Sequence, residues 1–245
     1  MTTAYAFFDV DGTLLRIKSM FSFHDFWYRR WKGLYDETTI EEYRDVTAIL
    51  RALAESDAPR ELINRRYYEF FAGRQVDEVT RCAQAWGRCA LSDPNLFISE
   101  VVDELNALRS RGVEPVFVSG SFREILEPVA ERLGVEQMLA IRLVQSGGRY
   151  TGRFDAPQTI GQGKALAIHQ FLAERQVKPA DCWAFGDDGS DLPMLAAVGH
   201  PVAVIGDPAL HELARDRGWR CMHLNAADDH SLIRSSLTAL VGATM

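Results

Sequence analysis

The stretch Phe7-Phe8-Asp9-Val10-Asp11-Gly12-Thr13-Leu14 carries a hydrophobic strand straight into two carboxylates that are separated by one residue. Side chains alternate along a strand, so Asp9 and Asp11 lie on one side if the strand continues, and a turn after it aims both at one crevice. The alternative is a plain solvated turn, with Asp11-Gly12 as the turn pair. Taken alone, the stretch favours neither interpretation.

Other short apolar runs indicate that this strand belongs to a sheet. Strand-like runs occupy residues 5–10, 113–118, 182–185, 201–205 and 220–224. Helical patterns separate several of them, which is typical of βαβ units and a mainly parallel sheet. The clearest helix follows Asp93-Pro94, repeats apolar residues from Leu96 to Leu108 at helical spacing and stops at Gly112. We therefore expect an α/β fold with a Rossmann-like, doubly wound parallel sheet.

Residues 16–90 differ, because they hold almost no strand signal. Aromatic-rich helical patterns lie at 21–31, 40–53 and 62–71, and a fourth lies near 76–89. About one helix is enough for an ordinary crossover between parallel strands. We therefore predict an all-helical cap at 16–90, inserted into an α/β core of residues 1–15 and 91–245. The alternative is that these helices merely cover one face of the sheet.

A smaller excursion from the core is expected at residues 139–154. There Gln145-Ser146-Gly147-Gly148-Arg149 separates two short strand-like runs. Two glycines between strand-like runs are typical of a β-hairpin turn. We find no internal repeat, no long linker and no heptad pattern that would mark an oligomer interface.

The composition is that of an ordinary globular protein. Of 245 residues, 47% are hydrophobic and 25% are charged, which excludes intrinsic disorder as an overall description. The formal net charge of -7 argues against a nucleic-acid partner. No run of about eighteen apolar residues is present and no basic region precedes the first strand, so we expect no membrane contact and a cytoplasmic location. The cysteines Cys82, Cys89, Cys182 and Cys221 are too scattered for a disulfide framework, and buried thiols are expected.

A second acidic strand end occurs in Trp183-Ala184-Phe185-Gly186-Asp187-Asp188-Gly189-Ser190-Asp191-Leu192. In isolation, Asp191 fits a helix N-cap and Asp187-Asp188-Gly189 fits a turn. If two strand ends of one sheet meet, however, five acids come together. Like charges that close raise one another's pKa values unless a cation neutralises them. Hard oxygen ligands in that number suggest Mg²⁺.

Two further stretches supply groups that suit an anion. After the strand at 113–118, Ser121 and Glu124 fit a capping box that starts a helix, and the Ser119 hydroxyl with exposed backbone N–H groups would suit a phosphate. The alternative there is an ordinary capped helix. Lys164 falls in the first turn of another helix, where a cation opposes the helix dipole. Most such lysines are tolerated at the surface, but a phosphate beside a carboxylate cluster would explain this one.

Four stretches, taken in chain order, resemble the haloacid dehalogenase superfamily of phosphohydrolases. They are the Asp9-Val10-Asp11-Gly12-Thr13 loop, Ser119, Lys164 and the Gly186-Asp187-Asp188-Gly189-Ser190-Asp191 loop. The resemblance covers the core from residue 4 to about 210. The runs Asp191-Leu192-Pro193-Met194-Leu195, Val198-Gly199-His200-Pro201-Val202-Ala203-Val204 and Gly148-Arg149-Tyr150-Thr151-Gly152 are similar to the phosphoserine-phosphatase-like branch, as is a helical cap after the first motif.

The resemblance implies a two-step phosphoryl transfer. Asp9 is expected to attack phosphorus and form an aspartyl-phosphate, and Asp11 to protonate the leaving alcohol and later activate water. Mg²⁺ is expected to be held by Asp9, the Asp11 backbone carbonyl and Asp187, with Asp191 supporting its water shell. The expected partner is a small-molecule phosphate ester.

The same resemblance assigns the phosphate-binding groups. Thr13, Ser119, Gly120 and Lys164 are expected to hold the phosphoryl oxygens, where charge must be stabilised. The cap would close over the substrate and exclude bulk water. A phosphotransferase that uses the same intermediate remains an alternative. A catalytically silent binding module on the same fold is another alternative. Such a module is expected to have lost Asp9, Asp11, Lys164 or Asp187, and none of these is lost.

Lys18 departs from the family pattern. Phosphoserine phosphatases carry a glutamate at the corresponding position, where it holds the substrate ammonium. A cation there repels an ammonium and attracts a carboxylate or a second phosphate, so we predict that phosphoserine is a poor substrate. The alternative is that Arg16 and Lys18 are mere surface charges.

Several side chains of the predicted cap are assigned to packing. A core role is favoured over an apolar substrate pocket for the aromatic cluster Phe21, Phe23, Phe26, Trp27, Tyr28 and Trp31. His24 has no identifiable partner in the sequence and is interpreted as structural. Asp188 lies where the branch commonly has a neutral residue, and it is expected to point to solvent.

Overall fold

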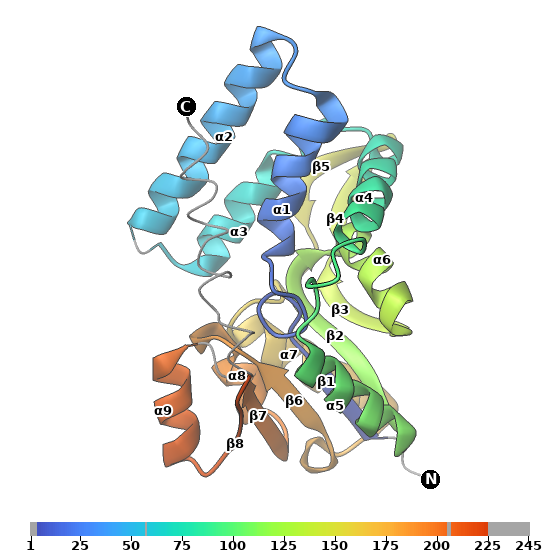
Figure 1. The fold of residues 1–245 in the computed structure, drawn as a ribbon, viewed down its shortest axis with the longest axis vertical. Coiled ribbons are helices and arrows are strands. Elements are labelled where there is room, and N and C mark those ends of the chain that lie inside the picture. The colour runs from blue at the N-terminus through green and yellow to red at the C-terminus, as the bar shows by residue number, and fades with distance from the viewer. Residues whose placement is uncertain (1–3, 57, 205–206, 225–245) are drawn as a thin grey trace.

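The computed structural model describes residues 4–56, 58–204 and 207–224, and a six-stranded sheet lies at the centre of this part of the chain. The strand order is β3-β2-β1-β6-β7-β8, and every neighbouring pair is parallel (Figure 1). The strands are β1 Ala4–Phe8, β2 Val113–Phe122, β3 Gln137–Ile141, β6 Trp183–Gly186, β7 His200–Val204 and β8 Arg220–Met222. The prediction of an α/β fold on a parallel sheet is confirmed.

Both faces of the sheet are buried, because residues on β1 alternate between two apolar clusters. Phe8 packs with the inner sides of α5 (Ser99–Ser110) and α6 (Arg123–Leu133). Phe7 points the other way, into a cluster with α7 (Gln162–Arg175), α8 (Leu192–Ala196) and α9 (Pro208–Asp216). A strand that buries both of its faces reads as a continuous apolar run, which is what Tyr5 to Phe8 provide.

The position of β1 determines where a ligand can bind. Phe8 lies opposite Phe117 of β2 on one side and Phe185 of β6 on the other. The chain moves outward in both directions from β1, so the strand order reverses there, and in open parallel sheets the crevice at the carboxyl ends beside such a point is where ligands bind. Asp9 follows β1 directly at this edge.

A group of helices between β1 and β2 lies above that edge of the sheet (Figure 1). We call it the helical layer: α1 Ser19–Phe26, the π-helical turn Trp27–Lys32, α2 Glu37–Glu55, α3 Arg60–Glu69 and α4 Val76–Ala90. Its core contains Phe23, Trp27 and Tyr28, which confirms the packing role expected for them. Phe21, in contrast, lines a cavity described below. The division into cap and core at 16–90 stays a prediction.

The expected hairpin forms, but it is shorter than 139–154. Its strands are β4 Leu143–Ser146 and β5 Arg149–Phe154, whereas residues 139–141 belong to the edge strand β3. The turn is made by Gly147 and Gly148, both with positive φ. The hairpin is hydrogen-bonded to the helical layer, since the Gly73 N–H donates to Tyr150 O at 2.8 Å and the Val76 N–H donates to Gly148 O at 3.0 Å.

The start of one helix differs from the sequence pattern. The helix expected after Asp93-Pro94 begins only at Ser99, because the preceding residues pair with the loop after β1. There the Arg16 N–H donates to Leu96 O and the Ile98 N–H donates to Leu14 O, each at 2.9 Å. The short 3-10 helices are Pro179–Asp181 and Gly189–Asp191. In the strand expected at 201–205, residue 205 lies outside the described residues, as do residues 225–245 of the predicted core.

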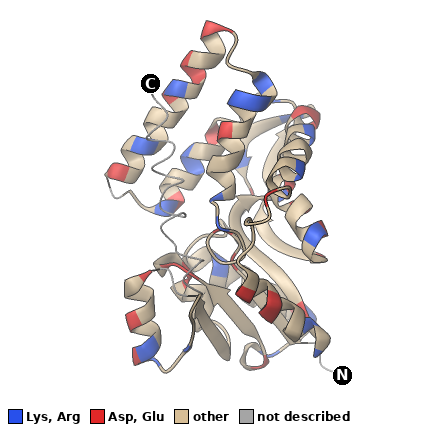
Figure 2. Cartoon of the chain, in the orientation of Figure 1, with Lys and Arg blue, Asp and Glu red and all other residues tan. Residues whose placement is uncertain are grey.

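The surface carries both signs of charge. Lys and Arg are interspersed with Asp and Glu along α2 and α9 (Figure 2). Cys82 and Cys182 are buried as expected, but Cys89 is exposed and Cys221 is partly buried. Within the described ranges, the helices are all too short or too polar to cross a bilayer. The cytoplasmic location stays a prediction.

Candidate active site

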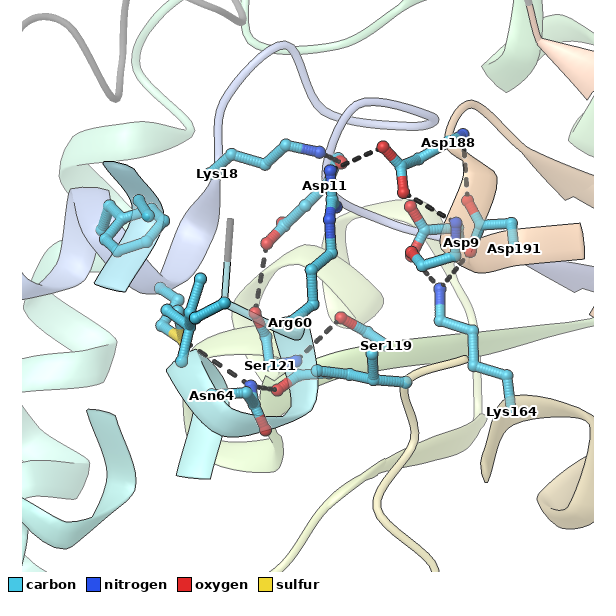
Figure 3. A pocket seen from close by; sticks show the side chains of 18 residues that line it. Asp9, Asp11, Lys18, Arg60, Asn64, Ser119, Ser121, Lys164, Asp188 and Asp191 are labelled. Carbon is cyan, nitrogen blue, oxygen red and sulfur yellow. Dashed lines mark hydrogen bonds and ion pairs between the residues drawn. The ribbon is translucent and has the colours of Figure 1, made fainter. Parts of the chain in front are cut away.

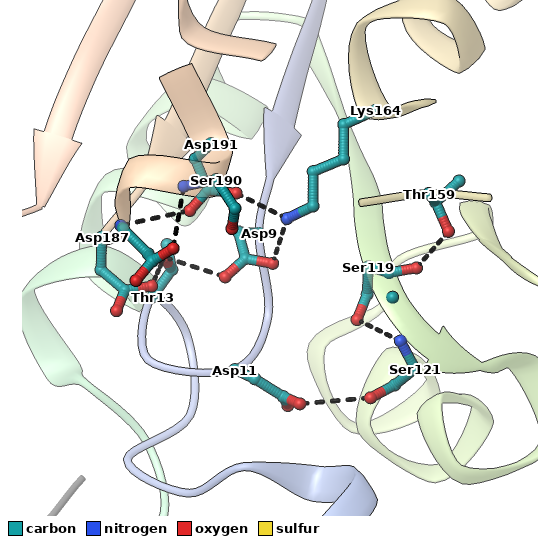
Figure 4. A network of polar contacts seen from close by, with 12 residues as sticks. Asp9, Asp11, Thr13, Ser119, Ser121, Thr159, Lys164, Asp187, Ser190 and Asp191 are labelled. Carbon is teal, nitrogen blue, oxygen red and sulfur yellow. Dashed lines mark hydrogen bonds and ion pairs between the residues drawn. The ribbon is translucent and has the colours of Figure 1, made fainter. Parts of the chain in front are cut away.

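Three buried carboxylates meet at the carboxyl edge of the sheet (Figure 4). Asp9 follows β1, while Asp187 and Asp191 follow β6. Each offers a carboxylate oxygen, and these oxygens lie within 4.8 Å of one another. The Asp9 N–H donates to Phe185 O at 2.9 Å, which ties the two strand ends together. The two acidic strand ends of the sequence therefore come together.

Lys164 joins this cluster from the first turn of α7. Its ammonium lies 2.6 Å from Asp9 Oδ1 and 2.7 Å from Asp191 Oδ1. Burial by itself would lower the pKa of Lys164, but the carboxylates of Asp191 and Asp9 raise it above its ordinary value. The side chain is therefore a permanent cation at the acid cluster and not a surface lysine.

The remaining charge of the cluster is only partly compensated. Burial raises the pKa values of Asp187 and Asp191, and the neighbouring carboxylate of Asp9 raises both further. Thr13 Oγ1 lies 3.0 Å from Asp187 Oδ1 and 3.5 Å from Asp9 Oδ2, so its single proton serves one carboxylate at a time. Buried carboxylates that raise one another's pKa values favour the binding of a cation, because its charge relieves their repulsion.

The donor set fits a small hard cation such as Mg²⁺. Carboxylates of Asp9 and Asp187 and the backbone carbonyl of Asp11 are oxygen donors of the kind that Mg²⁺ prefers. Gly12 has φ +105°, and a Cβ there would lie only 2.4 Å from Asp187 Oδ2. The loop therefore needs glycine at this position both for its backbone conformation and for the close approach of Asp187.

The Asp11 side chain points away from this cluster. Its Oδ2 accepts hydrogen bonds from Ser19 Oγ at 2.9 Å and Ser121 Oγ at 3.1 Å, and its buried Oδ1 has no hydrogen-bond partner. Burial raises the pKa of Asp11, although the nearby charge of Lys18 lowers it in part. Asp9 and Asp11 thus share one strand end but have different surroundings.

The predicted capping box of Ser121 and Glu124 is wrong. Ser121 belongs to β2, which continues to Phe122, and α6 begins after it with no side-chain cap. Glu124 accepts a hydrogen bond from the Tyr150 hydroxyl at 2.5 Å. Ser119 does face the site as expected, and its Oγ accepts from the Ser121 N–H at 3.0 Å.

A cavity of about 410 Å³ lies between the acid cluster and the helical layer (Figure 3). Asp9, Asp11 and Lys164 line it from the sheet, together with the Ser119-Gly120-Ser121 segment of β2. The helical layer contributes the apolar side chains Met20, Phe21, Ala54 and Ile63, and Ala58 lines the cavity from the connection between α2 and α3. A cavity of this size accommodates a small organic molecule.

Lys18 lines the same cavity, but its ammonium lies on the acid cluster. It donates to the backbone carbonyl of Asp11 and lies 4.0 Å from Asp187 Oδ2. Burial would lower the pKa of Lys18, yet the charges of Asp187, Asp9 and Asp11 raise it. Lys18 is therefore not a mere surface charge.

Two contacts from α3 were not foreseen. Arg60 forms an ion pair of 2.6 Å with Asp188, so the expectation that Asp188 points to solvent is wrong. Asn64 donates to Gly120 O at 2.7 Å. Nothing in the helical pattern of α3 marks either side chain as one that reaches the sheet, because such a pattern identifies only the apolar face.

His24 has the structural role expected of it. It is buried, and its Nε2 lies 3.2 Å from Thr47 Oγ1. Burial, with a smaller contribution from the charge of Arg74, lowers the pKa of His24 to about 3. The imidazole is therefore neutral at physiological pH and takes no part in the cavity.

Comparisons with known proteins agree with this geometry. A family model for haloacid dehalogenase-like hydrolases matches residues 6–196. A probable phosphatase of Mycobacterium tuberculosis is 30% identical over 216 residues, which cover 87% of this chain and 73% of that protein. A protein of the same organism named phosphoserine phosphatase SerB1 is 30% identical over 225 residues, or 89% of this chain and 70% of its own.

The fold is also similar to solved structures. A phosphoserine phosphatase solved as a phospho-aspartyl intermediate analogue superimposes with a TM-score of 0.62 at 19% identity, over 91% of this chain and 94% of that one. At that level of identity the likeness extends to the fold alone. It includes the parallel sheet and its flanking helices.

Proposed function

The chain belongs to the haloacid dehalogenase-like hydrolases, and from this premise we propose that it is a magnesium-dependent phosphatase that hydrolyses a small-molecule phosphomonoester through an aspartyl-phosphate on Asp9. The observation that carries the proposal is the separation of two neighbouring acids. The Asp9 carboxylate lies 2.6 Å from the Lys164 ammonium, while Asp11 is hydrogen-bonded to serines. The Lys164 ammonium thus lies against the acid proposed as the nucleophile, while the pKa of the buried Asp11 carboxyl is raised, which suits it to exchange a proton.

In the first step, a carboxylate oxygen of Asp9 attacks phosphorus and the bond from phosphorus to the ester oxygen breaks. The leaving alkoxide takes a proton from the Asp11 carboxyl. The raised pKa of Asp11 favours its protonated form before this step. Covalent attack by Asp9 divides one difficult displacement into two easier ones.

In the second step, the Asp11 carboxylate removes a proton from water, whose oxygen attacks phosphorus. The bond from phosphorus to the Asp9 oxygen breaks, inorganic phosphate leaves, and Asp11 is protonated again. Ser19 and Ser121 hold the Asp11 carboxylate in place through both proton transfers. One residue thus acts first as the acid and then as the base.

Charge on the transferring phosphoryl group is balanced by residues at the sheet edge. We assign contacts with its oxygens to Thr13, to Ser119 and Gly120, and to Lys164, whose preorganised donors are most effective in a site that excludes water. When bound by Asp9, Asp187 and the Asp11 carbonyl, with Asp191 beside it, Mg²⁺ supplies further charge stabilisation.

We further propose that phosphoserine is a poor substrate, although relatives carry that name. Among the described residues between positions 18 and 64 that line the cavity, the charged ones are Lys18 and Arg60, and none is a carboxylate. A substrate ammonium therefore finds no counterion on this wall, and two cations repel it.

The test is phosphate release from a panel of phosphomonoesters, with Mg²⁺ or with EDTA. Wild type is compared with Asp9→Asn and with Asp216→Asn, an exposed acid on α9. We expect turnover that requires Mg²⁺, is lost in Asp9→Asn and persists in Asp216→Asn. Activity that survives Asp9→Asn would exclude the proposed nucleophile. Phosphoserine turnover that equals that of the best substrate would contradict the proposed specificity.

A further inference from the structure

We propose that Lys18 is a built-in counterion of the divalent-cation site, and that a bound cation displaces its ammonium into the cavity. The inference rests on the proposed function only in requiring that site. It assigns Lys18 a place at the metal donors when no metal is bound and a place facing the substrate when one is.

The contacts of Lys18 carry the proposal. Its ammonium donates to the backbone carbonyl of Asp11 and lies 4.0 Å from Asp187 Oδ2 (Figure 3 shows Lys18 directed at Asp11). These two oxygens belong to the donor set that fits Mg²⁺. A metal cation bound to these two oxygens would lie directly beside the ammonium, and two positive charges that close together in a buried site repel each other.

The distribution of charge explains why an ammonium occupies this place. Three carboxylates gather here, those of Asp9, Asp187 and Asp191. Lys164 forms ion pairs with two of them at 2.6 and 2.7 Å and is buried. Lys18 is the cation that faces Asp187, and among the described residues Thr13 is the other side chain in polar contact with that carboxylate.

Lys18 also has room to move. It precedes α1, so its backbone is fixed at the start of that helix, but its side chain is 21% exposed and borders the 410 Å³ cavity. The side chain of Lys164 is only 5% exposed. A rotation of the Lys18 side chain would carry its charge from the donors into the cavity, where it could meet a carboxylate or second phosphate of the substrate, as the sequence predicts.

Calorimetric titration with Mg²⁺ tests the displacement. Lys18→Met is compared with wild type and with Lys178→Met, which removes the same charge from an exposed position. We expect Lys18→Met to bind Mg²⁺ at least tenfold more tightly than wild type, and Lys178→Met to bind as wild type does. Equal or weaker binding by folded Lys18→Met would overturn the proposal.

Acetylation of the wild-type chain by acetic anhydride, followed by mass spectrometry, gives a test that needs no variant. Mg²⁺ should raise the labelling rate of Lys18 several-fold while leaving buried Lys164 and exposed Lys178 unchanged. Labelling of Lys18 that is constant or reduced with Mg²⁺ would overturn the inference alone. Failure of the wild-type chain to bind Mg²⁺ at all would overturn the magnesium dependence of the proposed function as well.

Discussion

The hydroxyl of Ser121 donates a hydrogen bond of 3.1 Å to Oδ2 of Asp11, across 110 residues of sequence. The bond joins the carboxyl ends of β1 and β2, two adjacent parallel strands. It fixes the orientation of a carboxylate that, in the proposed mechanism, meets both a leaving group and a water molecule. Ser121 is thus a positioning residue for the proposed proton transfers.

Ser121→Ala is expected to lower kcat roughly tenfold with little change in KM, because a hydrogen bond to a charged group contributes about 1.5–3 kcal/mol. Steady-state phosphate release measures both constants. Ser110→Ala is the control, since that exposed hydroxyl donates to Ala107 O within its own helix. An unchanged kcat in Ser121→Ala would show that Ser19 alone orients Asp11.

Lys164→Met is expected to destabilise the protein and to abolish activity. Removing this ammonium leaves Asp9 and Asp191 buried without their cation, and breaking a buried ion pair in this way costs about 3–5 kcal/mol. Urea unfolding at neutral pH measures the loss. Lys178→Met, at an exposed position, should change the free energy of unfolding by less than about 0.5 kcal/mol. A variant as stable as wild type would contradict the proposed pairing.

Gly12→Ala is expected to cost more stability than Gly73→Ala. Both glycines have positive φ, which disfavours any other residue by about 1–2 kcal/mol. At Gly73 a new Cβ meets nothing within 4 Å, but at Gly12 it lies 2.4 Å from Asp187 Oδ2. We expect a further loss of about 1–3 kcal/mol in urea unfolding and weaker Mg²⁺ binding for Gly12→Ala. Equal losses would mean that Asp187 yields freely.

His24→Gln is expected to reduce the sensitivity of the protein to acid. Since the pKa of His24 is lowered to about 3, the unfolded chain binds a proton below about pH 6.5 that the folded chain does not bind. The free energy of unfolding therefore falls as the pH falls, and this residue accounts for about 2 kcal/mol between pH 7 and pH 5. Urea unfolding at both values should show that difference between wild type and variant.

The control for this pH effect is His169→Gln, at an exposed position of α7. It should retain the acid sensitivity of the wild type. A His24→Gln variant with the same pH dependence as wild type would mean that the imidazole accepts a proton in the folded state.

The gathering of Asp9, Asp187 and Lys164 could be predicted because it follows from topology. Parallel strands bring their carboxyl ends to one edge, so acids that follow apolar strands meet there whatever their separation in sequence. A helix that begins at the same edge adds its first turn, and with it Lys164. The order of these motifs along the chain then indicates the haloacid dehalogenase superfamily.

Local rules failed where a distant segment competed for the same groups. Ser121 satisfies a capping rule, but its hydroxyl is taken by Asp11 and its backbone by β2. Residues after Asp93 continue into a pairing with the loop that follows β1, and the helix begins later. Arg60 and Asp188 meet across 128 residues, a contact that no local pattern contains.

The hydrogen bonds between the hairpin and the helical layer also limit how the enzyme can admit a substrate. A domain that is joined to the rest of a protein only by its two connecting segments can rotate about them in a hinge motion. Here the backbone of residues 73–76 is hydrogen-bonded to the turn and second strand of the β4–β5 hairpin, which follows β3 in the chain. These hydrogen bonds form a third connection besides the two connecting segments. We therefore expect the cavity entrance to be nearly rigid and to select substrates by their size. Adjustment is expected from side chains such as Met20 and Arg60, without a wide opening of the helical layer.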